Sequence, residues 1–225
     1  MSKVDLIMCI DKEKYLDIAI KNNILCGANT HAANRLKDKY NLQFLDFAYK
    51  KPDFEKHLDL CKSIRPKYVS APDIFYEKEL DKTLDFANEL RNYSENVIII
   101  PKCADIIERI ERKFTIGFSI PTTYGGTEGI AVWDITNYDI HLLGGSPAKQ
   151  LWYKQYFKNI ISLDGNSYIK IARLSKQYWD VTWKTSPALD CNSLINLSIQ
   201  GIKKAWGLNG EDAYIYSEQS PRTPL

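Results

Sequence analysis

Short apolar runs recur along the whole chain, and each is followed by a segment with the spacing of an amphipathic helix. A buried strand followed by a helix is the repeating unit of a parallel βαβ fold, because a parallel neighbour is reached only through a crossover connection. This repetition predicts an α/β fold, a closed (β/α)8 barrel of TIM type, with an open doubly wound sheet as the alternative. The runs cover residues 4–10, 23–28, 42–47, 67–73, 96–102, 114–121, 138–145 and 159–166.

The chain has 225 residues, of which 44% are hydrophobic, and this length suits one barrel of that size. We expect a single domain over residues 1–216 that ends in the amphipathic helix LINLSIQGIKKAWGLN, and a flexible tail over residues 217–225. The connection YGGTEGIAVWDITN, after the sixth run, is the weakest helix prediction.

Composition excludes several protein classes. The five cysteines are odd in number and none has metal-ligand spacing to another, which argues against a disulfide framework and a zinc site. The formal net charge of +2 is not that of a strongly basic nucleic-acid coat, although local basic patches are compatible with it. The N-terminal apolar run is too short for a signal peptide or a membrane span, so we expect a cytoplasmic protein without a membrane partner.

Polar residues follow the predicted strands directly. In a (β/α)8 barrel the carboxyl ends of the strands share one face, and that face holds the active site. The residues that we expect there are Asn29, Thr30, His31, Asp46, Asp73, Lys102, Thr122, Thr123, Tyr124, Gly144, Gly145, Ser146, Asp164, Gly165 and Asn166.

Three of these residues are carboxylates. Asp46 follows an apolar strand, so its carboxyl is desolvated and suits a general acid/base; an N-cap or an ion-paired rim residue is the alternative. Asp73 is either an acceptor for a base edge or sugar, or an N-cap for the segment IFYEKEL. Asp164 is a candidate carboxylate nucleophile, with Gly165 leaving space for a substrate, or else part of an Asp-Gly turn.

The segment GGSP at residues 144–147 predicts a turn with positive φ that leads into a capped helix. Such a turn either offers backbone N–H groups to a ligand or is a tight connection without one. His31 is either a catalyst or a helix N-terminal residue, and Lys102 either pairs with a carboxylate or binds phosphate.

The segment after the eighth run is basic and aromatic. Lys170, Arg173 and Lys176 form a candidate nucleic-acid patch, and Trp179 and Trp183 are candidate stacking platforms. The alternatives are a solvated charged face and core tryptophans.

The motifs also occur in a familiar order. The segments ILCGANTHAANRL, FLDF, YVSAPD, VIIIPK, IGFSIPTTYGG, IHLLGGSP and SLDGN span roughly residues 20–170. In this order they resemble the tRNA-guanine transglycosylase superfamily, and specifically its shorter phage-type relatives that insert 7-deazaguanines into DNA. Each motif is short, so the resemblance rests on their succession.

The resemblance implies a mechanism at the matched positions. Asp164 would attack C1′ of the target deoxyguanosine, Asp46 would protonate the departing guanine and then deprotonate the incoming base, and Asp73 would hold the base. The partners would be DNA and a free 7-deazaguanine such as a preQ0-type compound, with no cofactor, in the host cytoplasm for a phage-encoded protein. The residues implied in substrate contact are Asn29, His31, Lys102, Ser119, Gly144, Gly145, Ser146 and Asn166.

The chain departs from the family pattern at three places. The cysteine-rich zinc site of the tRNA enzymes is missing, which makes DNA the expected substrate and no metal the expected state. Pro101 or Lys102 stands in place of the base-reading Gln, and Ser119-Ile120 in place of Gly-Gly. A nucleoside or base N-glycosidase and a non-catalytic nucleic-acid-binding barrel remain alternative functions.

Overall fold

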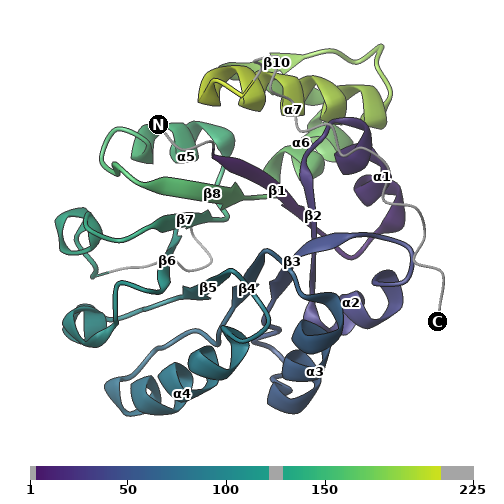
Figure 1. The fold of residues 1–225 in the computed structure, drawn as a ribbon. Helices are drawn as coiled ribbons and strands as arrows, with labels where there is room; N and C mark the ends of the chain where they lie inside the picture. The colour runs from purple at the N-terminus through teal and green to yellow at the C-terminus, as the bar shows by residue number, and fades with distance from the viewer. Residues whose placement is uncertain (1–3, 122–128, 209–225) are drawn as a thin grey trace.

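Eight parallel strands close into one barrel, in which each strand pairs with its neighbours in the chain and β1 pairs with β8 (Figure 1). The computed structural model describes residues 4–121 and 129–208. The closed barrel confirms the predicted fold class and excludes the open doubly wound sheet. The strands are β1 (Asp5–Cys9), β2 (Leu25–Asn29), β3 (Leu42–Asp46), β4 (Tyr68–Ser70), β5 (Asn96–Ile99), β6 (Thr115–Ser119), β7 (Ile140–Leu143) and β8 (Ile160–Asp164).

Helices surround the barrel and connect successive strands (Figure 1). Two connections carry only 3-10 turns among their described residues: η2 after β5 and η3 after β6. Among its described residues, the segment weakly predicted as a helix after β6 forms η3, where β-branched residues disfavour a longer helix. The helices are α1 (Glu13–Lys21), α2 (Thr30–Leu36), α3 (Phe54–Ile64), η1 (Glu77–Glu79), α4 (Leu80–Leu90), η2 (Ala104–Arg109), η3 (Val132–Ile135), α5 (Pro147–Tyr153), α6 (Ser167–Ser175) and α7 (Cys191–Trp206).

Alternation along the strands divides the buried apolar residues into two cores. The larger core lies between the strands and the helices, and it includes Met8, Leu45 and Val69. A smaller core, formed by Ile7, Leu25, Phe44, Tyr68, Ile98 and Ile100, fills the barrel interior. The side chains that alternate with the larger core therefore point into the barrel, and those at the strand ends face its carboxyl-terminal mouth.

The chain after β8 adds a second layer on the outside of the barrel. After α6 it forms an antiparallel hairpin, β9 (Gln177–Asp180) and β10 (Thr182–Thr185), and then α7, which lies beside α6 (Figure 1) and is hydrogen-bonded to Asn22 at the end of α1. α7 covers most of the segment LINLSIQGIKKAWGLN. Residues 209–216 and the predicted tail 217–225 lie outside the described residues. None of the helices described is long and apolar enough to cross a bilayer.

Candidate active site

The three predicted carboxylates lie at one mouth of the barrel. Asp46 and Asp164 are the last residues of β3 and β8, and Asp73 follows β4 by three residues. The negative charges of Asp164 and Asp73 both act on Asp46, which shows that the three groups share one environment. The structure therefore brings together residues that are up to 118 positions apart in the sequence, from Asp46 to Asp164.

The carboxyl of Asp46 is desolvated, but it keeps one hydrogen bond to a neighbouring side chain. Its Oδ1 accepts a hydrogen bond of 2.8 Å from Ser70 Oγ on the neighbouring strand β4. Desolvation, followed by the negative charge of Asp164, raises the pKa of Asp46 to about 7, while the hydrogen bond from Ser70 opposes that rise. A carboxyl with this pKa exchanges a proton at neutral pH, which suits general acid/base chemistry.

Asp164 lies across the mouth with 14% of its side chain exposed. Its Oδ1 accepts a hydrogen bond of 3.0 Å from Gly144 N, at the end of β7. Gly144 has a φ of +71°, a conformation that favours glycine and that directs its N–H toward the carboxylate. The Gly144 N–H group thus donates to a side chain of the protein, and the ligand-binding interpretation of the GGSP turn stays a prediction.

The glycines around Asp164 have different physical roles. A Cβ on Gly144 would meet nothing within 4 Å, whereas one on Gly145 would lie 2.8 Å from the Ile120 side chain. A Cβ on Gly165 would lie 3.0 Å from Gln150 Nε2, so the expected open space beside Gly165 is filled by protein. Gln150 donates to the carbonyl oxygens of Gly144 and Asp164, and it thereby joins the turn to β8.

The rest of the GGSP turn forms as predicted. Ser146 is the N-cap of α5, where its side chain accepts from Lys149 N at 3.3 Å, and Pro147 is the first residue of that helix. Ser119 ends β6, in register with Leu143 of β7, so it also lies at this mouth. The segment Thr122-Thr123-Tyr124 lies outside the described residues.

Asp73 and Lys102 form an ion pair of 3.3 Å between Nζ and Oδ2. Both side chains are mostly buried, with exposed fractions of 22% and 11%. Desolvation raises the pKa of Asp73, and the charge of Lys102 opposes that rise. Lys102 therefore pairs with a carboxylate, as one of its two interpretations predicts, and Asp73 is not a helix N-cap, because the cap of η1 is Tyr76.

Asn29, His31 and Asn166 have structural roles at the edge of the mouth. Asn29 caps α2 by accepting from His31 N and Ala32 N. His31 lies exposed in the first turn of α2, and its Nε2 lies 3.1 Å from the carbonyl oxygen of Lys51. Asn166 donates from its amide nitrogen to the carbonyl oxygen of Cys9, so it joins β8 to β1. These contacts support the helix N-terminal interpretation of His31.

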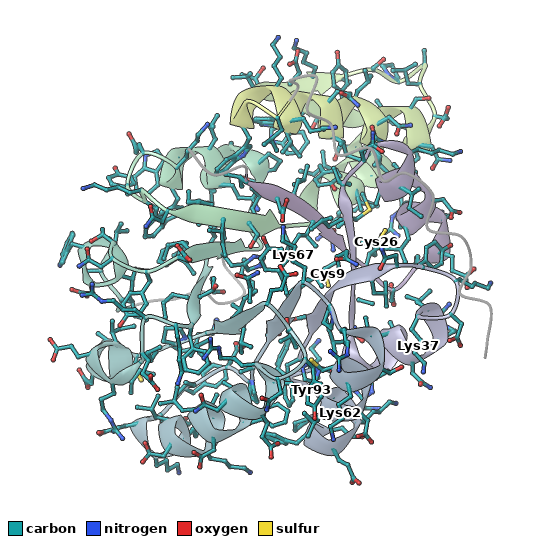
Figure 2. The ribbon with its side chains drawn as sticks, viewed as in Figure 1. Cys9, Cys26, Lys37, Lys62, Lys67 and Tyr93 are labelled. Carbon is teal, nitrogen blue, oxygen red and sulfur yellow. The ribbon has the colours of Figure 1, made fainter. Side chains whose placement is uncertain are left out.

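Three groups near Asp164 were missed by sequence reasoning: His141, Tyr168 and Cys9. His141 is fully buried inside the barrel, and the only sequence signal for it is a polar residue within an apolar strand. The hydroxyl of Tyr168 is also buried, and desolvation and then Asp164 raise its pKa. Desolvation and then the charges of Asp46 and Asp164 raise the pKa of Cys9, so its thiol is a neutral group toward the middle of the barrel (Figure 2).

The candidate nucleic-acid patch lies beside the mouth but extends away from it. Lys170 and Arg173 are exposed on α6, which begins at the mouth, and Lys176 is the exposed C-cap at the end of that helix. With a rise of about 1.5 Å per residue, Lys176 lies roughly 9 Å farther along the helix than Lys170. Trp179 is fully buried, and its backbone N donates to Ser198 Oγ of α7. The structure places Trp179 in the core, so it offers no stacking surface.

Exposed aromatic residues lie instead on two loops at the mouth. Tyr49, on the loop after β3, is 65% exposed, and Phe75 and Tyr76, on the loop after β4, are 51% and 64% exposed. Lys50 and Lys51 are exposed beside Tyr49. We call these five residues the aromatic rim. Sequence reasoning did not select it, because FAYKKPD and IFYEKEL are indistinguishable from ordinary loop sequence.

Within the described residues, no three His, Cys, Asp or Glu side chains gather in an arrangement that holds a metal ion. The titratable groups at the mouth instead contact serine, lysine and backbone N–H partners. The carboxylates at the mouth thus have different surroundings, a condition under which one carboxyl can transfer protons while another stays ionised.

The fold and the position of this site define the class of protein: a TIM barrel with polar residues gathered at the carboxyl ends of its strands. The crystal structure of TrpF from Jonesia denitrificans is similar to this chain, with a TM-score of 0.52 and 9% sequence identity over 91% of this chain and 99% of that one. At this identity the likeness concerns the fold. The chain belongs to the family described as "Family of unknown function (DUF6610)", whose model matches residues 19–207. No curated protein matches the sequence.

Proposed function

We propose that the protein is a DNA guanine transglycosylase, which exchanges guanine in DNA for a 7-deazaguanine base through a covalent aspartyl–sugar intermediate. The observation that carries the proposal is the pair Asp46 and Asp164, two carboxyls at one mouth with different surroundings. Asp46 has a pKa of about 7, whereas Asp164 is held by a backbone N–H group. Retaining sugar chemistry needs this division into a proton-transfer group and a nucleophile.

In the first step Asp164 Oδ2 attacks C1′ of the target deoxyguanosine. The bond from C1′ to the base nitrogen breaks, its electron pair moves to the departing guanine, and Asp46 supplies the proton that this base takes up. The sugar is then bound to Asp164 as an ester, so the glycosidic energy is conserved until the next base arrives.

In the second step the incoming base attacks C1′ through the same nitrogen, and its proton passes to Asp46. The bond from C1′ to Oδ2 breaks, and its electron pair restores the Asp164 carboxylate. Asp73 accepts hydrogen bonds from the polar edge of each base, because its ion pair with Lys102 favours the ionised form that accepts. The enzyme ends in the state in which it began.

The aromatic rim supports a nucleic-acid substrate. A base that is to react at C1′ must leave the helix stack, which costs roughly a few kcal/mol and is easier in locally opened DNA. Tyr49, Phe75 and Tyr76 present large exposed rings on the loops after β3 and β4, and aromatic stacking is the sequence-tolerant way to hold unpaired bases. Lys50 and Lys51 add positive charge at the same edge.

The test is base exchange in vitro. The protein is incubated with duplex or partly opened DNA and with labelled guanine or candidate 7-deazaguanines, and the digested nucleosides are identified by mass spectrometry. We expect label in the DNA without net loss of bases, and Asp164→Asn, which keeps the size of the side chain but removes its charge, should abolish the exchange while leaving the melting temperature and much of the DNA binding.

Three results would contradict the proposal. Accumulation of abasic sites without incorporation would identify a base N-glycosidase that uses water as the acceptor. DNA binding without any chemistry, unchanged in Asp164→Asn, would identify a non-catalytic barrel. Near-normal exchange in Asp164→Asn would remove Asp164 as the nucleophile and make Asp46 or Asp73 the next candidate.

A further inference from the structure

His141 is a buried polar residue in the interior of the barrel. Its ring is fully buried, lies against Phe44 with ring centroids 5.4 Å apart, and has Nδ1 at 2.8 Å from Ser162 Oγ. The other ring nitrogen, Nε2, is buried without a hydrogen-bond partner. A buried polar atom without a partner costs free energy unless a function compensates for it. Its position therefore calls for an explanation.

The acceptor that faces this nitrogen is Asp164. Its Oδ1 lies 3.6 Å from His141 Nε2, slightly beyond a normal hydrogen bond. A ring nitrogen with only a lone pair would repel the carboxylate oxygen, so the forms with hydrogen on Nε2 are favoured. Ser162 can serve either ring form, because its hydroxyl both donates and accepts. The arrangement thus directs an N–H group at Asp164.

Oδ1 of Asp164 faces two donors. Gly144 N lies 3.0 Å from it, and His141 Nε2 lies 3.6 Å from the same atom. The two donors come from one strand, β7 and the turn that follows it, whereas the carboxylate ends β8. With Oδ1 occupied, Oδ2 is the oxygen left for the substrate. The contacts therefore distinguish two atoms that are chemically identical in a free carboxylate.

We propose that His141 is a positioning residue for Asp164, which together with Gly144 holds Oδ1, presents Oδ2 to C1′, and stabilises the carboxylate when the intermediate breaks down. The inference rests on the proposed function. In the ester, Oδ2 is bonded to C1′ and Oδ1 is the carbonyl oxygen. When the C1′–Oδ2 bond breaks, the electron pair returns to the carboxylate, and hydrogen bonds to a charged acceptor are stronger than those to a neutral one.

This argument predicts which step depends on His141. Donors that prefer the carboxylate over the ester favour the departure of Asp164 from the sugar, the step that completes the exchange. Loss of the donor should slow this breakdown more than it slows formation, so the covalent protein–DNA species should accumulate. A merely structural role would lower both steps, or the amount of folded protein, without raising the trapped fraction.

The experiment compares two substitutions, each of which places a side-chain amide near the position of one of the two ring nitrogens. His141→Gln places an amide near the position of Nε2 and keeps a donor toward Asp164, whereas His141→Asn keeps a group near Nδ1 and loses that donor. We expect kcat for exchange to fall ~10- to 100-fold in His141→Asn, as for other lost supporting contacts, with KM for the base within about twofold. His141→Gln should retain most of the rate, and covalent adduct on denaturing gels should increase only in His141→Asn.

A spectroscopic measurement tests the contact in the folded wild-type protein, whatever the stability of the variants. The chain has three histidines, and His57, which is also fully buried, contacts Thr30 and Ser70 and serves as the internal reference. Nitrogen-15 spectra should show hydrogen on Nε2 of His141, and Asp164→Asn should shift the His141 nitrogen signals while leaving those of His57 in place.

The outcomes separate this inference from the proposed function. Equal losses in His141→Gln and His141→Asn, a loss confined to KM, or His141 signals that do not respond to Asp164→Asn would each overturn the positioning role. If the wild-type protein exchanges no base with any probe, the proposed function fails, and the nitrogen spectra then report the His141–Asp164 contact by itself.

Discussion

Ser70 Oγ donates a hydrogen bond of 2.8 Å to Asp46 Oδ1, and the same hydroxyl oxygen accepts a hydrogen bond of 2.7 Å from Phe47 N. The carboxyl at the end of β3 is therefore held by the neighbouring strand, β4. This orients Asp46 toward the mouth without neutralising it, because a hydroxyl partner carries no charge. The net effect of the surroundings is still a pKa of about 7, since desolvation and the charge of Asp164 outweigh the hydrogen bond.

Asp46→Asn should stabilise the protein at alkaline pH. The folded-state pKa of about 7 lies above the ordinary value of 3.8, so folding takes up a proton between these pH values, and stability falls as pH rises through this window. The asparagine variant lacks this loss. We expect its free energy of unfolding to exceed that of the wild type by about 2–4 kcal/mol at pH 8, and by much less at pH 4. Urea unfolding at the two pH values measures the difference.

The control for this prediction is Asp85→Asn, which removes an exposed carboxyl from α4. It should change stability by no more than roughly 0.5 kcal/mol at either pH, as surface substitutions usually do. A gain for Asp46→Asn that is the same at pH 4 and pH 8 would show that ionisation of Asp46 is not its cause. Gain of stability with loss of exchange is the usual signature of a strained catalytic group.

Lys102→Met should weaken base binding in a pH-dependent way. The substitution removes the charge that opposes the rise in the pKa of Asp73, so this pKa rises further. Protonated Asp73 offers the base edge one acceptor fewer, and KM for the base should therefore increase more at the lower of two assay pH values than at the higher. We expect a change of roughly tenfold at the lower pH, the effect of one hydrogen bond to a charged group. An increase in KM that is equal at both pH values would indicate direct contact between Lys102 and the substrate.

The nucleic-acid interface should be at the aromatic rim rather than along α6. The double variant Tyr49→Ala with Tyr76→Ala should weaken binding of single-stranded DNA by about 1–3 kcal/mol for each stacked base that is lost. Trp152→Ala, which removes a 53% exposed ring from α5, is the matched control and should leave binding unchanged. Fluorescence anisotropy at several salt concentrations measures both.

The lysines and the arginine allow an independent comparison between the aromatic rim and the predicted patch at α6. Replacing Lys50 and Lys51 with Gln should reduce the salt slope by about 0.7 for each lost phosphate contact on a single strand. Replacing Lys170, Arg173 and Lys176 tests the patch that the sequence predicted. A larger reduction in the α6 variant would place the DNA backbone along that helix, and the rim would then contact only the reacting nucleotide.

Gly201→Ala should show that the hairpin and α7 are part of the folding unit. A Cβ at Gly201 would lie 2.3 Å from the carbonyl oxygen of Trp179, so the helix or the hairpin must move. Intrinsic helix preference alone would favour alanine by roughly 1 kcal/mol, yet we expect a net loss of about 1–3 kcal/mol from overpacking. Gly207→Ala is the control: it meets no atom within 4 Å, but its φ of +71° costs roughly 1 kcal/mol. Equal losses would exclude tight packing at Gly201.

The positions of the strands could be predicted from the sequence because buried parallel strands are short and continuously apolar. Seven of the eight predicted runs contain a barrel strand in full, the run 23–28 stops one residue short of the end of β2, and Asp46 and Asp164 end β3 and β8. The parallel arrangement then places both carboxyl ends at one mouth. The caps were predictable for a similar local reason, since Ser146 and Pro147 act on the turn in which they stand. The strand positions and the helix caps depend on residues that are close together in the sequence.

The contacts between strands were decided only by the tertiary structure. A register shift between Ile140 and His141 sets His141 opposite Ser162, and a shift by one residue would turn a side chain to the other face of the strand. Trp179 is a similar case, because its burial depends on α7, which folds back from about 20 residues farther along the chain. The sequence alone determined the barrel and the end of it at which the carboxylates lie. Register and long-range packing decided which partner each carboxylate meets, and thus which of its two oxygens is held by a donor.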